Sequence, residues 1–184
     1  TRFGNNKNFT TIEIEDLHPP EITNLDPVSV FEGHMSSFSI DVFDEDGDDL
    51  VTNWTMGDGT TYDDAGFDLF HMYMDDERYE ITITVDDGTY ITEEIFEVEV
   101  FNVAPTIDDI MFDNLGNEGD AASFSAHVTD VPSDEVEITW TFPDGTTIDS
   151  SFAQYTFTDD GEFIVMVTAS DEDGGESSEQ IMVT

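Results

Sequence analysis

Apolar and polar residues alternate along most of the chain. In the segment 78–86, apolar side chains at Tyr79, Ile81, Ile83 and Val85 are separated by polar ones. A period of two with many β-branched and aromatic residues is typical of half-buried strands. Clusters of Gly and Asp interrupt the pattern about every 8–12 residues, as they do in a β-sandwich. No segment shows the period of an amphipathic helix, so the pattern predicts an all-β fold.

The alternation predicts seven strands in each half of the chain. In the first half they fall at 22–31, 36–43, 50–56, 60–63, 67–73, 78–86 and 90–101. In the second half they fall at 107–112, 121–129, 136–142, 146–149, 152–157, 162–170 and 177–184. The similar spacing in the two halves indicates two copies of one unit.

An internal repeat divides the chain in the same way. The segment 54–60 reads WTMGDGT, and the segment 140–146, 86 positions later, reads WTFPDGT. Repeats of this size mark arrays of successive modules. We therefore predict one β-sandwich at 19–104, a second at 105–184, and the last strand and linker of a preceding module at 1–18.

The segment before the first predicted module leaves two interpretations open. Because residues 1–18 match the end of a module, we expect the chain to be an internal piece of a longer array. The alternative is that Thr1–Asp16 is a strand donated to a neighbouring subunit by β-augmentation. In both cases the expected partners are neighbouring repeats, copies of the chain, or other surface proteins.

The charge of the chain is extremely one-sided. It has 45 acidic and 3 basic residues, for a formal net charge of −42. Nucleic acid is excluded as an expected partner because phosphate binding needs a basic stripe. Hydrophobic residues make up 38% and aromatic residues 12%, which is too apolar for a disordered acidic segment. The acidic residues are therefore expected to coat a folded core, and their repulsion would be relieved by high salt or divalent cations.

Other sequence features favour an extracellular, prokaryotic cell-surface setting. The chain has no cysteine, although small secreted animal domains often use disulfides. No apolar stretch of membrane length is present, so we expect no membrane span in this segment. Two sequons, at Asn8 and Asn53, are candidate glycosylation sites if the protein is secreted. The alternative is that both asparagines are unmodified.

Three motifs in order resemble the PKD domain family. Residues 54–59 read WTMGDG, residues 71–73 read HMY, and residues 79–88 read YEITITVDDG. The family pattern is roughly W-x-F-G-D-G, then H-x-Y, then a long alternating strand. The second copy departs from it at Pro143, and Tyr155 replaces its histidine. The resemblance covers both modules and implies tandem immunoglobulin-like β-sandwiches. It also implies a function similar to that of the extracellular spacers in archaeal surface-layer proteins, bacterial adhesins and secreted hydrolases.

The residues of these motifs have local structural tasks. Asp-Gly pairs favour hairpin turns. The tryptophans are expected to fill the space between two sheets, and the histidine is expected to support a strand by hydrogen bonding. The motif positions are Trp54, Asp58, Gly59, His71 and Tyr73 in the first module and Trp140, Asp144 and Gly145 in the second.

The acidic loops give the main site hypothesis. In an immunoglobulin-like topology, the loop after the second strand, the loop before the last strand and the preceding linker share one end of the module. Carboxylate and carbonyl oxygens suit Ca²⁺, which takes about 6–8 oxygen ligands. We therefore predict calcium at each module joint, against the alternative that these loops are only a solvated acidic surface. The expected ligands are Asp16, Asp44, Asp46, Asp48, Asp86 and Asp87 for the first module and Asn102, Asp130, Asp134, Asp171 and Asp173 for the second.

No catalytic pattern stands out from the sequence. The chain has no cysteine nucleophile, no G-x-S-x-G motif and no phosphate-binding loop, and paired acids mean little when acids are everywhere. We expect a non-catalytic structural repeat of a surface layer or filament, in a salt-adapted archaeon. The alternatives are an adhesion module that binds carbohydrate or protein, and a spacer of a secreted hydrolase.

Overall fold

All regular structure in the described residues is β-strand. The computed structural model describes residues 18–25, 29–113 and 117–184. The strands are β1 (Glu21–Leu25), β2 (Val30–Phe31), β3 (Ser36–Phe43), β4 (Val51–Thr55), β5 (Thr61–Tyr62), β6 (Asp68–His71), β7 (Arg78–Asp86), β8 (Ile91–Phe101), β9 (Thr106–Asp113), β10 (Ala121–Thr129), β11 (Glu137–Thr141), β12 (Thr147–Asp149), β13 (Phe152–Thr156), β14 (Phe163–Ser170) and β15 (Glu176–Val183). Within these ranges no helix has the length and apolar character to cross a membrane. The predicted all-β class is confirmed.

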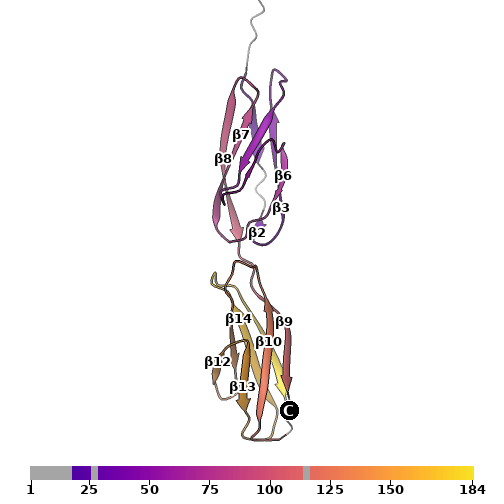
Figure 1. Ribbon diagram of the computed structural model, residues 1–184, viewed down its shortest axis with the longest axis vertical. Helices are drawn as coiled ribbons and strands as arrows, with labels where there is room; N and C mark the ends of the chain where they lie inside the picture. Colours follow the sequence, from indigo (N-terminus) through magenta and orange to yellow (C-terminus); the bar gives the residue numbers. More distant parts are fainter. Residues whose placement is uncertain (1–17, 26–28, 114–116) are drawn as a thin grey trace, which may run out of the picture.

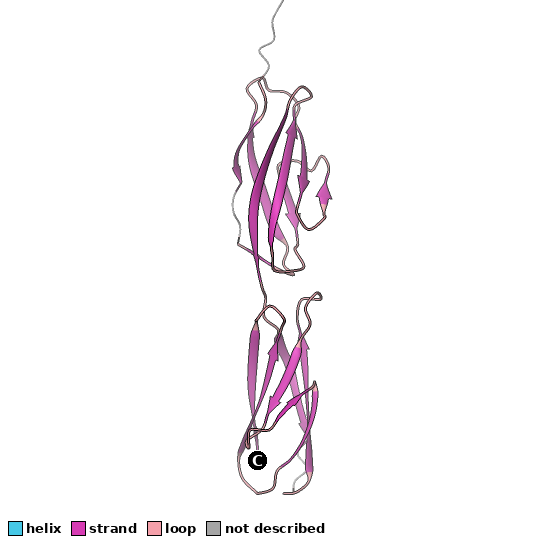
Figure 2. Cartoon of the chain, turned by 90° about the vertical axis from the view of Figure 1, so that its left-hand side faces the viewer, coloured by secondary structure: helices cyan, strands magenta, loops and turns pink. Residues whose placement is uncertain are grey.

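The first module is a sandwich of two sheets. One sheet has the order β1-β3-β6, and the other has the order β2-β8-β7-β4-β5. Neighbouring strands are antiparallel except β2 and β8, which run parallel with Val30 opposite Val100. Figure 2 shows the strands of this module arranged in two layers. The parallel β2–β8 pair ties the start of the module to its last strand.

The second module repeats this plan with fewer strands in its larger sheet. Its sheets have the orders β13-β10-β9 and β12-β11-β14-β15. The two modules stand end to end along the long axis of the molecule, joined by the short connection between β8 and β9 (Figure 1). The linker end of the second module therefore faces the far end of the first.

Each module has its own apolar core. Trp54 is 1% exposed in the core of the first module, and Trp140 is 0% exposed in the core of the second. Their indole Nε1 atoms donate to the carbonyl oxygens of Gly66 and Ser150, each at 3.1 Å. Burial of a large aromatic side chain with its N–H satisfied is strongly stabilising, so the two tryptophans anchor two separate sandwiches.

The largest difference from the predicted strands lies at the start of the first module. The alternation over 22–31 predicts one strand, but β1 belongs to the sheet of β3 whereas β2 pairs with β8 in the other sheet. The sequence between β1 and β2 contains Pro27, which has no backbone N–H to donate to a ladder. Period-two alternation reports which face of a strand is buried, and it carries no information on a change of sheet.

Candidate cation site at the module joint

Direct contacts join the two modules. The backbone N–H of Val103, in the linker, donates to Glu32 Oε1 at 2.8 Å. The hydroxyl of Ser133 donates to the carbonyl oxygen of Met74. Gly33 lies against Val131, so closely that a Cβ on Gly33 would fall 2.9 Å from Val131 Cγ2. The joint is therefore a packed interface with its own hydrogen bonds.

The second module presents several of the predicted calcium ligands to this joint. Asp171 Oδ1 accepts from the backbone N–H groups of Asp173 and Gly175 at 3.0 and 2.6 Å. Its Oδ2 accepts from Asn102 Nδ2 at 3.1 Å, which ties the linker to the loop between β14 and β15. The structure thus brings the linker and this loop together, as the topology argument requires.

Buried oxygens without a hydrogen-bond partner occur on the same side of the joint. They are Asn102 Oδ1, Asp130 Oδ2, and both Oδ1 and Oδ2 of Asp134. The other oxygen of Asp130 accepts from the Val131 N–H at 2.9 Å. A buried polar atom without a partner carries a desolvation cost. Oxygens of this kind have the chemistry to bind a hard cation.

The first module contributes three carboxylates that are not among the ligands predicted from the sequence. Glu32, Asp75 and Asp76, hereafter the joint triad, place one carboxylate oxygen each within 4.8 Å of the others. Glu32 directly follows β2, and its backbone N–H donates to the Phe101 carbonyl at 3.1 Å. Its side chain is 0% exposed, with Oε2 unpartnered. Sequence alternation could not find a buried carboxylate, because it assigns charged residues to the surface.

The electrostatics of the joint are unfavourable for so many carboxylates. Burial raises the pKa of Glu32 to about 7, against the opposing hydrogen bond from the Val103 N–H and with further increases from Asp134, Asp76 and Asp173. Burial and the adjacent charge of Asp173 also raise the pKa of Asp76. A bound cation would remove this mutual repulsion.

No basic side chain of the described residues neutralises the joint. Arg78 is the only Lys or Arg in the described part of the chain, since Arg2 and Lys7 lie before it. Its guanidinium bonds Glu97 Oε1 at 2.9 Å and Glu99 Oε1 at 2.8 Å on the surface of β8. The nearby His34 contacts the backbone of Glu32 instead of its side chain: His34 Nδ1 lies 2.8 Å from the Glu32 carbonyl oxygen.

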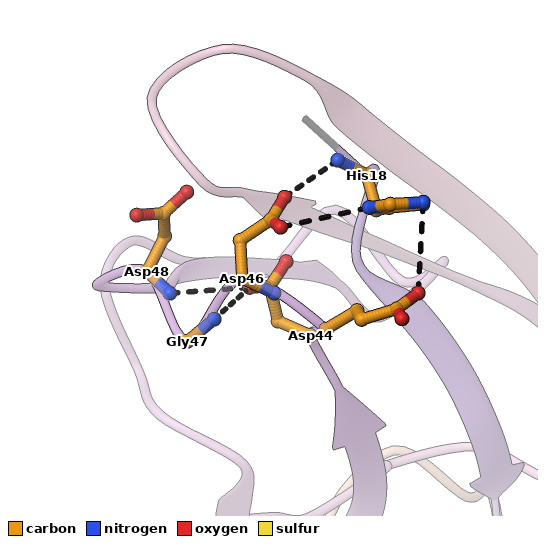
Figure 3. Close-up of polar contacts among 6 residues, drawn as sticks. His18, Asp44, Asp46, Gly47 and Asp48 are labelled. Atoms are coloured by element: carbon orange, nitrogen blue, oxygen red, sulfur yellow. Dashed lines mark hydrogen bonds and ion pairs between the residues drawn. The ribbon is translucent and has the colours of Figure 1, made fainter. Parts of the chain in front are cut away.

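The linker end of the first module has a different arrangement, drawn in Figure 3. Asp44 Oδ1 accepts from the backbone N–H groups of Asp46, Gly47 and Asp48 at 3.1, 2.7 and 3.1 Å, which folds the loop around that carboxylate. The backbone N–H of His18 donates to Asp46 Oδ2 at 2.6 Å, and its ring Nδ1 lies 3.5 Å from Asp46 Oδ1. Asp46 is thus engaged by a histidine at the position where the second module has Ala104.

The remaining predicted ligands of the first module turn back on their own loop. Asp86 Oδ1 accepts from the Gly88 N–H at 2.8 Å, and Asp87 Oδ1 accepts from the N–H groups of Thr89 and Tyr90, both at 2.6 Å. Asp16 lies outside the described residues. Among the described residues, none of the predicted ligands belongs to a group of three carboxylates as close as the joint triad.

A copy of the joint triad lies at the far end of the second module. Glu118, Asp159 and Asp160 also place one oxygen each within 4.8 Å of the others, but all three are exposed. Glu118 is the repeat partner of Glu32, 86 positions later, and Asp159 and Asp160 follow Asp75 and Asp76 by 84. This recurrence was the sequence signal that could have revealed both triads.

The motif histidine lies in a hydrogen-bonded chain of side chains. His71 Nε2 is 2.9 Å from Asp58 Oδ2, and His71 Nδ1 is 3.0 Å from the Tyr62 hydroxyl. The Tyr73 hydroxyl donates to the Met56 carbonyl at 2.8 Å, inside the core. These contacts connect β6 to the β4–β5 turn in the opposite sheet.

The two hairpin turns of the repeat have the same construction. Asp58 Oδ1 accepts from the Thr60 N–H at 2.8 Å, and Asp144 Oδ1 accepts from the Thr146 N–H at 2.9 Å. Gly59 and Gly145 follow with φ angles of +94° and +85°, values that favour glycine.

Only one of the two candidate glycosylation sites lies in the described part of the chain. Asn8 lies outside the described residues. The side chain of Asn53 is half-buried: its Nδ2 donates to Thr84 Oγ1 at 3.4 Å, and its Oδ1 accepts from the Asp64 N–H at 3.1 Å. Attachment of a glycan to Asn53 Nδ2 would leave one N–H on that atom, and the bond to Thr84 Oγ1 would then need this remaining hydrogen.

Comparisons with known proteins agree with this architecture. The PKD domain family matches the chain twice, at residues 17–100 and 102–184. A segment of two fibronectin type III domains from chicken tenascin is similar in structure, with a TM-score of 0.52, 12% identity, and coverage of 89% of this chain and 98% of that one. The amphioxus IgVJ-C2 molecule gives a TM-score of 0.49 and 19% identity, with coverage of 85% and 99%. No curated protein matches the chain.

Proposed function

Because the chain belongs to the PKD domain family, with both modules matched, we propose that it is a non-catalytic structural repeat of an extracellular cell-surface assembly. Modules of this family and its immunoglobulin-like relatives are typically non-catalytic structural or binding units, and PKD domains occur in extracellular proteins. The assembly is a surface layer or filament in which such modules follow one another in a line.

The observation that carries this proposal is the construction of the joint. The two modules meet through contacts between Gly33 and Val131 and between Met74 and Ser133, and Glu32 binds the linker through the Val103 N–H. The second module adds buried, unpartnered oxygens of Asn102, Asp130 and Asp134. A flexible tether between independent domains needs neither feature. We propose that Ca²⁺ binds these oxygens and stiffens the array.

The acidic surface supports a salt-adapted archaeal source. A net charge of −42 on 184 residues makes the folded state repel itself unless counter-ions screen it. Screening acts over about 8 Å at physiological ionic strength and over about 3 Å at molar salt. A surface of this kind is best tolerated where salt and divalent cations are abundant.

Two measurements test the proposed function. An antibody raised against the chain should label intact cells of the source organism as strongly as permeabilised ones. In calorimetry, CaCl₂ added to the chelator-treated chain should raise the melting temperature beyond the effect of NaCl at equal ionic strength. Labelling only after permeabilisation would contradict the surface location, and equal effects of the two salts would contradict the cation-stiffened joint.

A further inference from the structure

The joint triad of Glu32, Asp75 and Asp76 does not include any of the predicted calcium ligands, and those among the described residues lie at the linker end of each module. We propose that this triad is a second Ca²⁺ position, through which the first module shares in holding the joint. The inference rests on the proposed function, because it assigns further ligands to the same joint. It goes beyond the proposed function by making the far end of each module, and not only its linker end, part of the cation site.

The geometry of the triad fits a hard cation. One oxygen from each of the three carboxylates lies within 4.8 Å of the others. Calcium–oxygen distances of about 2.3–2.6 Å place ligands on opposite sides of one ion at most about 5 Å apart. All three groups can therefore contact one Ca²⁺ without a large change of the backbone. Mg²⁺ demands stricter octahedral geometry at shorter distances and should bind less well.

The burial of the Glu32 carboxylate also indicates that a positively charged ligand binds there. Glu32 is 0% exposed, its Oε1 accepts from the Val103 N–H, and its Oε2 has no partner. A carboxylate in this position needs a proton or a positive charge. No Lys or Arg of the described residues is available, because Arg78 pairs with Glu97 and Glu99. A divalent cation supplies the charge and the missing partner together.

An ion at the triad would lie beside carboxylates of both modules. Burial, and next the charge of Asp173 in the second module, raise the pKa of Asp76. Asp134 also lies within electrostatic range of Glu32. A cation among these groups would turn repulsion across the joint into attraction, and it would fix the rotation of one module against the other.

The exposed copy of the triad supports the same interpretation. Glu118, Asp159 and Asp160 repeat the arrangement at the end of the second module, where no described residue covers them. The triad is therefore a feature of the repeat, and Glu32 differs from its copy Glu118 in accepting a hydrogen bond from Val103 in the linker that leads to the next module. We infer that the exposed copy receives the acidic linker end of another module of this kind, with Ca²⁺ between them.

Isothermal titration of the whole chain with CaCl₂, after removal of metal by a chelator, tests the joint triad. Glu32→Gln keeps the acceptor for the Val103 N–H and removes only the charge. We expect Glu32→Gln, and the double variant Asp75→Asn/Asp76→Asn, to weaken one Ca²⁺ site at least about tenfold. The matched controls are Glu118→Gln and Asp159→Asn/Asp160→Asn, which remove the same charges from the exposed copy and should change that site less than about twofold.

Melting in chelator separates ligand loss from misfolding. Without Ca²⁺, Glu32→Gln should melt at the same temperature as the wild type or higher, because it removes a buried charge; with Ca²⁺ it should melt lower. If the calcium titrations of Glu32→Gln and Glu118→Gln gave the same affinities, the triad would not be a Ca²⁺ site of the joint. If Asp171→Asn still abolishes the calcium effect in that case, the proposed function stands without the triad. A wild type that takes up no Ca²⁺ would contradict both the triad site and the cation-stiffened joint, and the surface location would still be decided by the antibody test.

Discussion

At the scale of the residue, the first module is stabilised by a polar chain that its second copy lacks. His71 lies between Asp58 and the Tyr62 hydroxyl, and its ring packs edge-on against Tyr73 with centroids 4.5 Å apart. In the second module Tyr155 takes this place and stacks on Phe142 at 4.3 Å. The same backbone position therefore accepts either a histidine hydrogen bonded to an aspartate or a tyrosine stacked on a phenylalanine.

The pair of Asp58 and His71 gives a prediction for pH dependence. Although burial opposes it, the Thr60 N–H and hydroxyl and the imidazole of His71 hold the pKa of Asp58 below its usual value of 3.8. A depressed carboxyl pKa stabilises the fold above the unfolded pKa, and the stabilisation is lost as the pH falls through the folded pKa. We expect Asp58→Asn to cost about 1–2 kcal/mol at neutral pH, and the difference from wild type should shrink below pH of about 4.

Asp144→Asn is the matched control for that prediction. Asp144 makes the same bond to Thr146 but faces Tyr155 instead of a histidine. At neutral pH, Asp144→Asn should lower the free energy of unfolding less than Asp58→Asn does. Urea unfolding at a series of pH values measures both. A cost of Asp58→Asn that stays constant from neutral to acid pH would contradict an ionic role for the pair.

Gly33 is the residue at which close packing of the two modules is most easily tested. Gly33 and its repeat partner Gly119 have φ angles of +66° and +84°, so alanine is strained at both. Only at Gly33 would the new Cβ also meet another side chain, 2.9 Å away on Val131, whereas nothing lies within 4 Å at Gly119. The two positions thus share the backbone cost and differ in the contact.

We therefore expect Gly33→Ala to displace the modules and Gly119→Ala to leave them in place. Both variants should lose about 1 kcal/mol from the backbone term. Small-angle scattering in CaCl₂ should show altered interdomain geometry for Gly33→Ala alone. Identical scattering from the two variants would show that the modules do not pack through Gly33 in solution.

At the scale of the element, the alternation of apolar and polar residues predicted most of the strands. The segments 36–43, 78–86 and 121–129 are predicted with the bounds that the structure has for β3, β7 and β10. These strands have one buried face, which is the property that a period of two reports. The break between β1 and β2 was not predictable in this way, because partner choice depends on contacts between distant strands.

The candidate site was harder to predict than the fold. Topology placed Asn102 and Asp171 together, and they are hydrogen bonded. The joint triad combines Glu32, after β2, with Asp75 and Asp76, before β7, and only the folded chain shows that these segments meet. The burial of Glu32 and its hydrogen bond from Val103, 71 residues later, arise only in the folded chain, so no local pattern contains them.

The separate cores predict that each sandwich melts largely by itself. Trp54 and Trp140 belong to different core clusters. Trp54→Ala should destabilise the first module by about 3–5 kcal/mol through loss of buried surface and the cavity left behind. In chelator, calorimetry should then show one lowered transition and one near the wild-type temperature. The remaining Trp140 reports the second module by fluorescence, and a fall of its transition by the same amount would contradict independent cores.

At the scale of the whole molecule, two forces act on the arrangement of the modules. Packing at Gly33 and Val131 and the hydrogen bond from Val103 to Glu32 hold the modules end to end. Burial, and after it the repulsion among neighbouring carboxylates of both modules, raises the pKa of Glu32, Asp76 and Asp130. The balance should therefore depend on cations, with a defined joint when Ca²⁺ is present and a looser one when it is absent.

The distance distribution between the two modules tests this account most directly. The chain has no cysteine, so Glu93→Cys on β8 and Glu179→Cys on β15, both exposed, provide unique sites for spin labels. Double electron–electron resonance should give a single narrow distribution of distances between the two labels in CaCl₂. After chelation at equal ionic strength, the distribution of distances should be broader. Distributions of equal width in the two conditions would contradict a joint that is held by calcium.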